Sequence, residues 1–162
     1  MKVHNFHYNT CPLLMHNPFI GYFCPLWDKV EKYYEIDKLK STVPDDLTIV
    51  TWNNGGSKGL VEKQMDFLGI SYLTLGKGVH WTTNRMKPKL LLENFHLINT
   101  KYILGVDCFD VLIVDDLKGI IDKFTSKQTK ILYNATGTVY PHTKEDKTIE
   151  QLMCPPPFRY FN

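Results

Sequence analysis

A short apolar run that ends in acidic residues constrains this chain more than any other stretch. Residues 102–106 are apolar and include β-branched side chains, the pattern of a buried β-strand. Asp107 follows the run directly, and Asp110 comes shortly after it. Buried carboxylates are costly unless a cation or hydrogen-bond donors meet them. Because open α/β sheets bind ligands at the carboxyl ends of their strands, the run predicts a ligand site at this point.

Two interpretations of the acidic pair compete. A hard divalent cation, Mn2+ or Mg2+, prefers oxygen ligands and could link Asp107 and Asp110 to a phosphate group. Alternatively, both residues are turn residues, since Asp often starts or caps a local turn. A D-x-x-D spacing alone does not decide between them, because so short a motif occurs often without function.

β-Branched runs and helical patterns alternate along most of the chain. Strands are predicted at residues 47–52, 70–75, 101–106 and 130–135. Helices are predicted at residues 59–68, 87–98 and 117–124, with Leu90, Leu91, Phe95, Leu97 and Ile98 on the apolar side of the second. The alternation predicts an α/β protein with a Rossmann-like, mostly parallel sheet flanked by helices.

Residues 1–46 carry a weaker pattern and are predicted to form an N-terminal extension with an amphipathic helix at 27–39. Several of its side chains are of metal-binding types, but their spacing fits no zinc pattern; they are His4, His7, Cys11, His16 and Cys24. A proline-containing turn at 43–46 separates the extension from the predicted domain at 47–162.

Composition narrows the choice of compartment and partner. The net charge is only +2 and no basic run of nucleic-acid type occurs, so we expect no nucleic-acid partner. No secretory start and no apolar run of membrane-spanning length are visible, which predicts a cytoplasmic protein without a membrane span. Four cysteines without a C-x-x-C pair suggest free thiols, although three disulfide pairings remain open.

Two glycine-containing loops follow predicted strands. The loop at 53–56, Asn-Asn-Gly-Gly, matches neither the P-loop nor the dinucleotide fingerprint. It is either a tight turn or part of a pocket for a base or ribose near Thr51. The loop at 76–83 contains Trp81, which either serves a site or packs on the domain surface.

Several motifs occur in one order from about Leu47 to Asn162. They are Thr48-Ile-Val-Thr51, Leu75-Gly76 with Trp81 and Lys87, the run Tyr-Ile-Leu-x-x-Asp-x-Phe-Asp-Val from Tyr102, and Ile131-Leu-Tyr-Asn-Ala135 followed by Tyr140-Pro141. Together they resemble the glycosyltransferase domain of the procollagen lysyl hydroxylase (PLOD) family, which has a GT-A-type fold. The Asp-x-aromatic-Asp core is the most specific of these matches.

The resemblance implies a metal-dependent glycosyltransferase, a hexosyltransferase that moves a sugar from a UDP-sugar to an acceptor. The acceptor is unknown and could be a protein, a glycan or a small molecule. Asp107 and Asp110 would bind Mn2+ (or Mg2+) and, through it, the donor diphosphate. The resemblance assigns the UDP-sugar to a further set of residues, namely Ile49, Thr51, Trp81, Lys87 and Phe109. Phe109 stands where the family typically has Tyr, and no catalytic residue is assigned.

The chain also departs from the family pattern. Thr136 follows Asn134-Ala135 where the family has an acidic residue. Family chains continue to a His that completes the metal site, whereas this one stops at Asn162, so we expect a fold truncated at its C-terminal end. Two other functions stay open, a nucleotide- or sugar-binding module without turnover and an interaction domain in which the acids are turn residues.

Overall fold

A three-stranded parallel sheet is the largest sheet among the residues described by a computed structural model, which are 4, 9, 11–16 and 41–133. The chain forms two compact units, residues 1–123 and 124–162. In the first unit, β2 (Leu47–Trp52) lies between β3 (Leu73–Leu75) and β4 (Tyr102–Asp107) and is parallel to both. The structure thus confirms a mixed α/β protein with a parallel sheet.

The strand register brings the carboxyl ends of all three strands to one edge of the sheet. Trp52, the last residue of β2, pairs with Leu75 of β3 and with Asp107 of β4. Parallel strands need crossover connections. A helix lies in each connection here, because the chain runs from strand to helix to strand between β2 and β3 and again between β3 and β4. Asp107 therefore lies where α/β sheets bind ligands.

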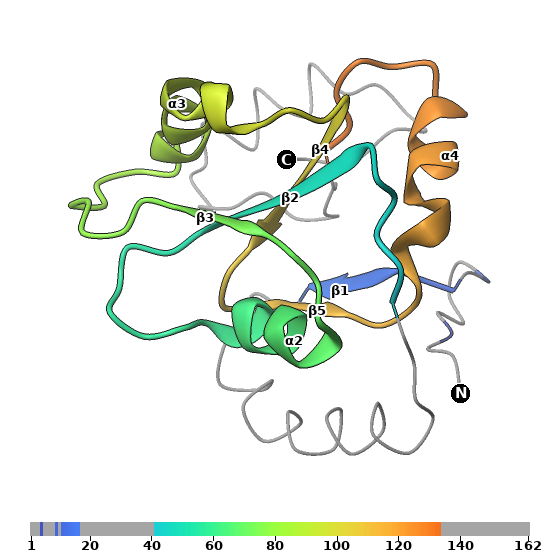
Figure 1. The fold of residues 1–162 in the computed structure, drawn as a ribbon, viewed down its shortest axis with the longest axis horizontal. Coiled ribbons are helices and arrows are strands. Elements are labelled where there is room, and N and C mark those ends of the chain that lie inside the picture. The colour runs from blue at the N-terminus through green and yellow to red at the C-terminus, as the bar shows by residue number, and fades with distance from the viewer. Residues whose placement is uncertain (1–3, 5–8, 10, 17–40, 134–162) are drawn as a thin grey trace, which may run out of the picture. The chain divides into compact units, whose positions relative to one another are not determined.

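Helices cover both faces of this sheet (Figure 1). Adjacent residues of β2 point to opposite faces. Ile49 packs with Val61 and Met65 of α2 (Leu60–Leu68), whereas Val50 packs with Leu90 of α3 (Met86–Glu93). The helical pattern predicted at 59–68 is confirmed. The helix α2 ends at Gly69, whose φ of 69° favours a residue without a Cβ atom.

A second, two-stranded sheet was not predicted from the sequence. The strand β1 (Leu14–His16) pairs antiparallel with β5 (Val111–Ile113), which begins just after Asp110. Each strand has only three residues, too few for an alternating pattern to stand out. The helix α2 lies against β5 and makes it part of the main core.

Two sequence predictions about apolar residues are wrong. Residues 130–133, the described part of the strand predicted at 130–135, form no strand, and Ile131 and Tyr133 are 66% and 71% exposed. Phe95 and Leu97 are exposed rather than core residues, because α3 ends at Glu93 and a 3-10 turn, η1 (Phe95–Leu97), breaks the helical period. The helix predicted at 27–39 lies outside the described residues.

The remaining elements follow β5. The 3-10 turn η2 (Leu117–Gly119) leads into α4 (Ile120–Thr125), in the region where one helix was predicted. Asp116 caps the start of the turn, since its Oδ1 accepts a hydrogen bond from the Lys118 main-chain N at 3.0 Å. A cap of this kind stabilises the start of a helical turn and does not by itself indicate a catalytic or binding role.

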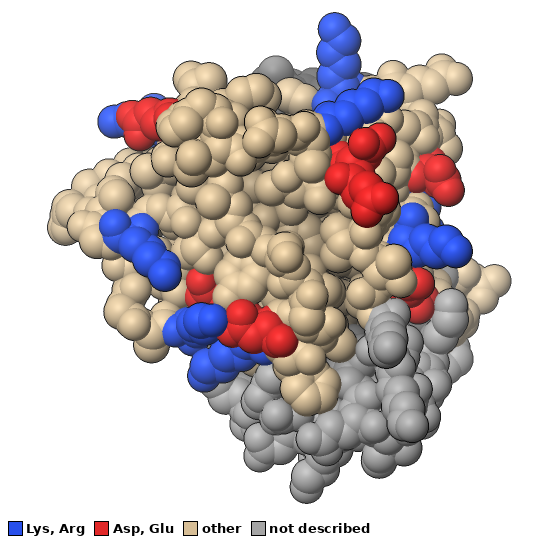
Figure 2. Space-filling model, viewed as in Figure 1, with Lys and Arg blue, Asp and Glu red and all other residues tan. Residues whose placement is uncertain are grey.

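The surface carries charges of both signs. Figure 2 shows acidic and basic side chains interspersed on the face that it draws, in keeping with a net charge of +2. Within the described ranges, no helix has the length and apolar character needed to cross a membrane. Cys11 and Cys108 carry free thiols, and Cys24 and Cys154 fall outside those ranges.

Candidate functional site

Asp107 and Asp110 flank a short turn that connects the two sheets. Asp107 is the last residue of β4 and pairs with Trp52, while Asp110 directly precedes Val111, the first residue of β5. Both ends of the turn are thus fixed by strand pairing. The two carboxylates lie at the carboxyl edge of the parallel sheet with side-chain exposures of 38% and 20%.

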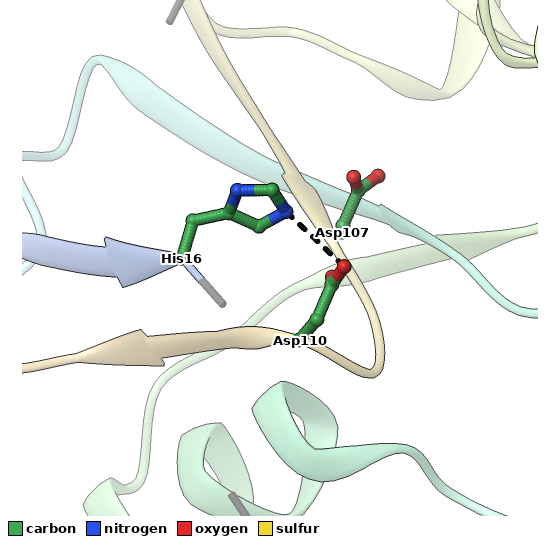
Figure 3. A group of neighbouring side chains, drawn as sticks. All are labelled: His16, Asp107 and Asp110. Carbon is green, nitrogen blue, oxygen red and sulfur yellow. Dashed lines mark hydrogen bonds and ion pairs between the residues drawn. The ribbon is translucent and has the colours of Figure 1, made fainter. Parts of the chain in front are cut away.

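A histidine from the other end of the sequence joins these acids. His16, the last residue of β1, has its Nε2 atom 3.1 Å from Oδ2 of Asp110. One ligand atom from each of His16, Asp107 and Asp110 lies within 4.8 Å of the others. Figure 3 shows the imidazole directed toward the Asp110 carboxylate, with the Asp107 side chain next to them. Two carboxylates and an imidazole form a donor set that fits Mn2+ and related divalent ions.

Lys87 supplies a positive charge at the same place. Its ammonium group forms an ion pair with Oδ1 of Asp107. Trp52 holds Lys87 in two ways, because the indole Nε1 donates to the Lys87 carbonyl at 3.1 Å and the ring centroid lies 5.9 Å from Nζ. Gly105 leaves room for the indole, since a Cβ atom there would be 2.8 Å from the ring. The sequence-predicted Lys87 and Asp107 are therefore in direct contact.

The other residues assigned to the donor lie in different surroundings. Ile49 and Thr51 are 1% and 0% exposed, and the Thr51 hydroxyl donates to the Val106 carbonyl at 2.9 Å. Trp81 packs on the core at the α3 face of the sheet, the opposite face from Ile49. Phe109, between the two acids, is 39% exposed. Lys87 and the two acids thus come together, whereas the side chains of Ile49 and Trp81 lie on opposite faces of the sheet.

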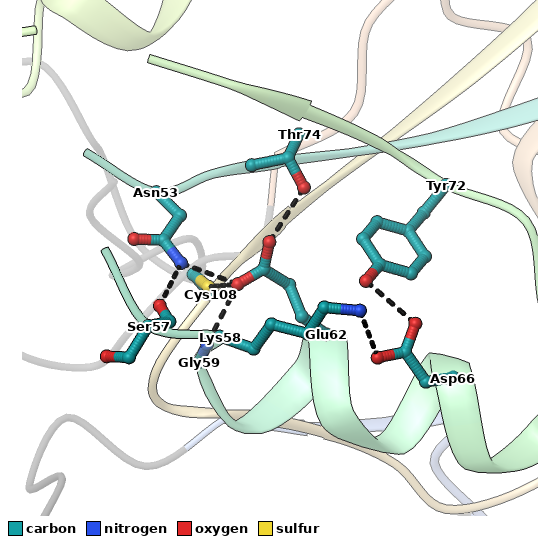
Figure 4. A network of polar contacts seen from close by, with 9 residues as sticks. All are labelled: Asn53, Ser57, Lys58, Gly59, Glu62, Asp66, Tyr72, Thr74 and Cys108. Atoms are coloured by element: carbon teal, nitrogen blue, oxygen red, sulfur yellow. Dashed lines mark hydrogen bonds and ion pairs between the residues drawn. The ribbon is translucent and has the colours of Figure 1, made fainter. Parts of the chain in front are cut away.

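A buried carboxylate organises the loops next to the acids. Glu62 of α2 is 1% exposed and accepts hydrogen bonds from four groups (Figure 4). The donors are Asn53 Nδ2 at 2.6 Å, the Gly59 main-chain N at 2.8 Å, Thr74 Oγ1 at 2.7 Å and Cys108 Sγ at 3.0 Å. These donors come from the ends of β2 and β4, from β3 and from the start of α2. The Glu62 side chain therefore connects all three strands and α2 at the carboxyl edge of the sheet.

This network shifts the ionisation of both buried groups. Burial acts to raise the pKa of Glu62, but hydrogen bonds from Cys108, Gly59, Thr74 and Asn53 outweigh burial and leave that pKa lowered. Burial, followed by the hydrogen bond to Glu62, raises the pKa of the Cys108 thiol to about 12. Glu62 is therefore the charged acceptor and Cys108 a neutral donor, which stabilises the turn between the acids.

Sequence reasoning missed three residues of this edge. His16 was considered as a metal ligand, but no zinc spacing supported it, and its partner Asp110 is 94 positions away. Trp52 was assigned only to a strand. Glu62 gave no signal, because an acid in the first turn of a helix is ordinarily explained by the helix dipole. For these three residues, the one available sequence signal was that His16 is of a metal-binding type.

Comparison with known proteins gives one match. The family model for the PLOD GT domain matches residues 45–149, well over half of the 162 residues. No curated protein and no solved structure matched the chain. The match spans the parallel sheet, both acids and Lys87, and it begins after His16. The chain therefore belongs to the family of PLOD glycosyltransferase domains, as its motifs indicated.

Proposed function

We propose that this protein is a metal-dependent glycosyltransferase, or the donor-binding part of one, that uses a UDP-sugar. The observation that carries the proposal is the meeting of Asp107, Asp110 and Lys87 at the carboxyl edge of a parallel sheet in a PLOD glycosyltransferase domain. We further propose that residues 47–162 form a GT-A-like domain and residues 1–46 an extension to it. The acceptor is a protein, glycan or small molecule.

In this proposal, Asp107 and Asp110 would hold Mn2+ or Mg2+, and a bound ion would supply positive charge next to the diphosphate leaving group. Lys87 adds a second positive charge. Its ammonium group forms an ion pair with Asp107 in the described structure, so it would have to leave that carboxylate and turn to the diphosphate for Asp107 to hold a metal ion. The hydrogen bond from Trp52 to the Lys87 carbonyl holds the main chain and does not involve the ammonium group, so it can persist when the side chain moves.

The remaining donor contacts are proposed with roles suited to their positions. The exposed ring of Phe109, between the acids, stacks near the uracil, and Trp81 closes the side of the site formed by the loop at 76–83. Thr51 is buried at the end of β2 and its hydroxyl donates to the Val106 carbonyl, so its proposed part is to position the end of β4 that carries Asp107. Ile49 has its side chain in the core, so its part is to hold the strand that carries Thr51.

The experiment is calorimetric titration of UDP into the full chain, with and without Mn2+. We expect Mn2+ to strengthen UDP binding in the wild type, because the diphosphate adds ligands to a site that two carboxylates hold only weakly. Asp110→Asn should remove most of this coupling. Asp45→Asn, at an exposed aspartate in the turn before β2, is the matched control and should keep it.

Equal UDP affinity in all these titrations would show that the acids are only turn residues and would reject the nucleotide site. Coupled binding without sugar transfer to any acceptor tested would support a nucleotide-binding module instead of an enzyme. Transfer from a UDP-sugar that needs Mn2+ and Asp110 would establish the glycosyltransferase.

A further inference from the structure

We propose that His16 is the third protein ligand of the divalent-metal site and that β1 belongs to the functional domain. The inference rests on the proposed function, which places a metal at Asp107 and Asp110. His16 lies outside residues 45–149, the part matched by the family model. The ligand is thus supplied by the N-terminal region and not by the matched domain.

The geometry of the three side chains carries the inference. The Nε2 atom of His16 is 3.1 Å from Asp110 Oδ2, and all three ligand atoms lie within 4.8 Å of one another. A metal ion at their centre would replace the direct contact between imidazole and carboxylate. Neutral imidazole offers a nitrogen lone pair for this purpose. The side chain of His16 is 34% exposed, so an ion has access to it.

Strand pairing fixes the place of His16 beside Asp110. In the register of β1 and β5, Leu14 pairs with Ile113 and His16 with Val111, the residue after Asp110. The Val114 main-chain N extends the pairing by donating to the Leu13 carbonyl at 2.9 Å. A slip of one residue would turn the imidazole to the other face of the sheet. The register is therefore the feature that places this ligand at the site.

Burial holds the register in place. Leu13 and Leu14 pack on the core that contains Ile113 and Leu117, and Met15 packs on Leu112. Each of these contacts would be lost if β1 moved along β5. His16, at the end of the strand, points to the acids because the apolar residues before it are anchored. Two carboxylates and water alone make a weak site, and an imidazole nitrogen strengthens it for Mn2+.

The experiment uses the full chain with Mn2+ and UDP. Electron paramagnetic resonance measures the Mn2+ affinity, and spin-echo envelope modulation detects a nitrogen atom bonded to the ion. We expect imidazole nitrogen modulation in the wild type. We expect it to be lost in His16→Gln, with Mn2+ affinity lowered roughly tenfold or more. His96→Gln, at an exposed histidine of η1, is the matched control and should change neither.

Two further measurements show whether His16→Gln removes only the metal ligand or also unpairs β1. Hydrogen exchange of the Val114 amide reports whether β1 is still paired in His16→Gln. In a second variant, the other five of the six histidines are replaced by Gln and only His16 is kept. Nitrogen modulation that persists in this variant assigns the ligand to His16 without any change in β1.

The outcomes distinguish this inference from the proposed function. If the wild type binds no Mn2+, or if Asp110→Asn binds it as well as the wild type, the proposed metal site itself fails. If Mn2+ binding depends on Asp110 but nitrogen modulation is absent, or is lost from the variant that retains only His16, the inference is overturned and the proposed function stands. In that case His16 only positions the Asp110 carboxylate.

Discussion

At the scale of single residues, Lys87 has two opposite effects on the proposed site. Its ammonium group neutralises Asp107 in the described structure and so competes with a metal ion for that carboxylate. With a diphosphate bound, the same charge favours the ligand. Lys87→Gln should therefore strengthen Mn2+ binding in the absence of nucleotide and weaken UDP binding in the presence of Mn2+. Both groups are partly exposed, so we expect each effect to be about 0.5–1 kcal/mol, or roughly two- to fivefold in Kd.

Calorimetry of Mn2+ alone and of UDP with saturating Mn2+ measures the two effects of Lys87→Gln separately. Lys89→Gln, on the exposed side of the same helix, is the control and should alter neither. A variant that weakens both Mn2+ and UDP binding would show that Lys87 serves only to hold Asp107 in place.

Cys108 lies between the two acids, yet its thiol should be unreactive. Burial and the hydrogen bond to Glu62 raise its pKa to about 12, so almost no thiolate forms near neutral pH. In the folded protein at about pH 8, iodoacetamide should modify the exposed Cys11 and leave Cys108 unmodified until the chain unfolds. Mass spectrometry of the separate peptides measures this, and equal modification of both residues in the folded protein would contradict it.

At the scale of secondary structure, α2 holds the turn that carries the acids. The buried Gln64 side chain donates to the Ile113 carbonyl at 2.6 Å and accepts from the Ile113 main-chain N at 2.7 Å, so the helix pairs with β5 as an additional strand would. Gln64→Leu removes both bonds. We expect the free energy of unfolding to fall by about 2–4 kcal/mol and Mn2+ binding to weaken, because Asp110 directly precedes β5.

Chemical denaturation measures the stability of Gln64→Leu against that of the wild type. Lys63→Leu, at the adjacent exposed position of α2, should leave stability almost unchanged. A cost below 0.5 kcal/mol for Gln64→Leu, about the size of a neutral surface change, would mean that the pairing of α2 with β5 does not hold the turn.

Secondary structure was predictable from the sequence where the periodic pattern was long. The six residues of β2 and the nine of α2 were predicted almost to the residue, since apolar spacing over such lengths is distinctive. The strand β1 was not predicted, because it forms by pairing with β5, which is distant in the sequence, and its own three residues carry no distinctive pattern. Residues 130–133 show the reverse error, since an apolar run is exposed where it was expected to form a strand.

At the scale of the whole molecule, some residues of the candidate site could be predicted from the sequence and others could be found only in the structure. Asp107, Asp110 and Lys87 belong to motifs within residues 45–149, so sequence resemblance could assign them. His16 reaches the acids only through the β1–β5 register, and Trp52 and Glu62 act through contacts that no local pattern encodes. The site is thus a product of the tertiary fold as much as of its motifs.

The central claim is that a divalent metal binds between the acids at the carboxyl edge of the sheet. Crystals of the full chain grown with Mn2+ and UDP test it most directly, through the anomalous scattering of manganese. We predict one strong anomalous peak within bonding distance of Asp107, Asp110 and His16, with the diphosphate of UDP completing the coordination. A manganese peak elsewhere, or ordered UDP with no metal beside Asp107 and Asp110, would contradict the account.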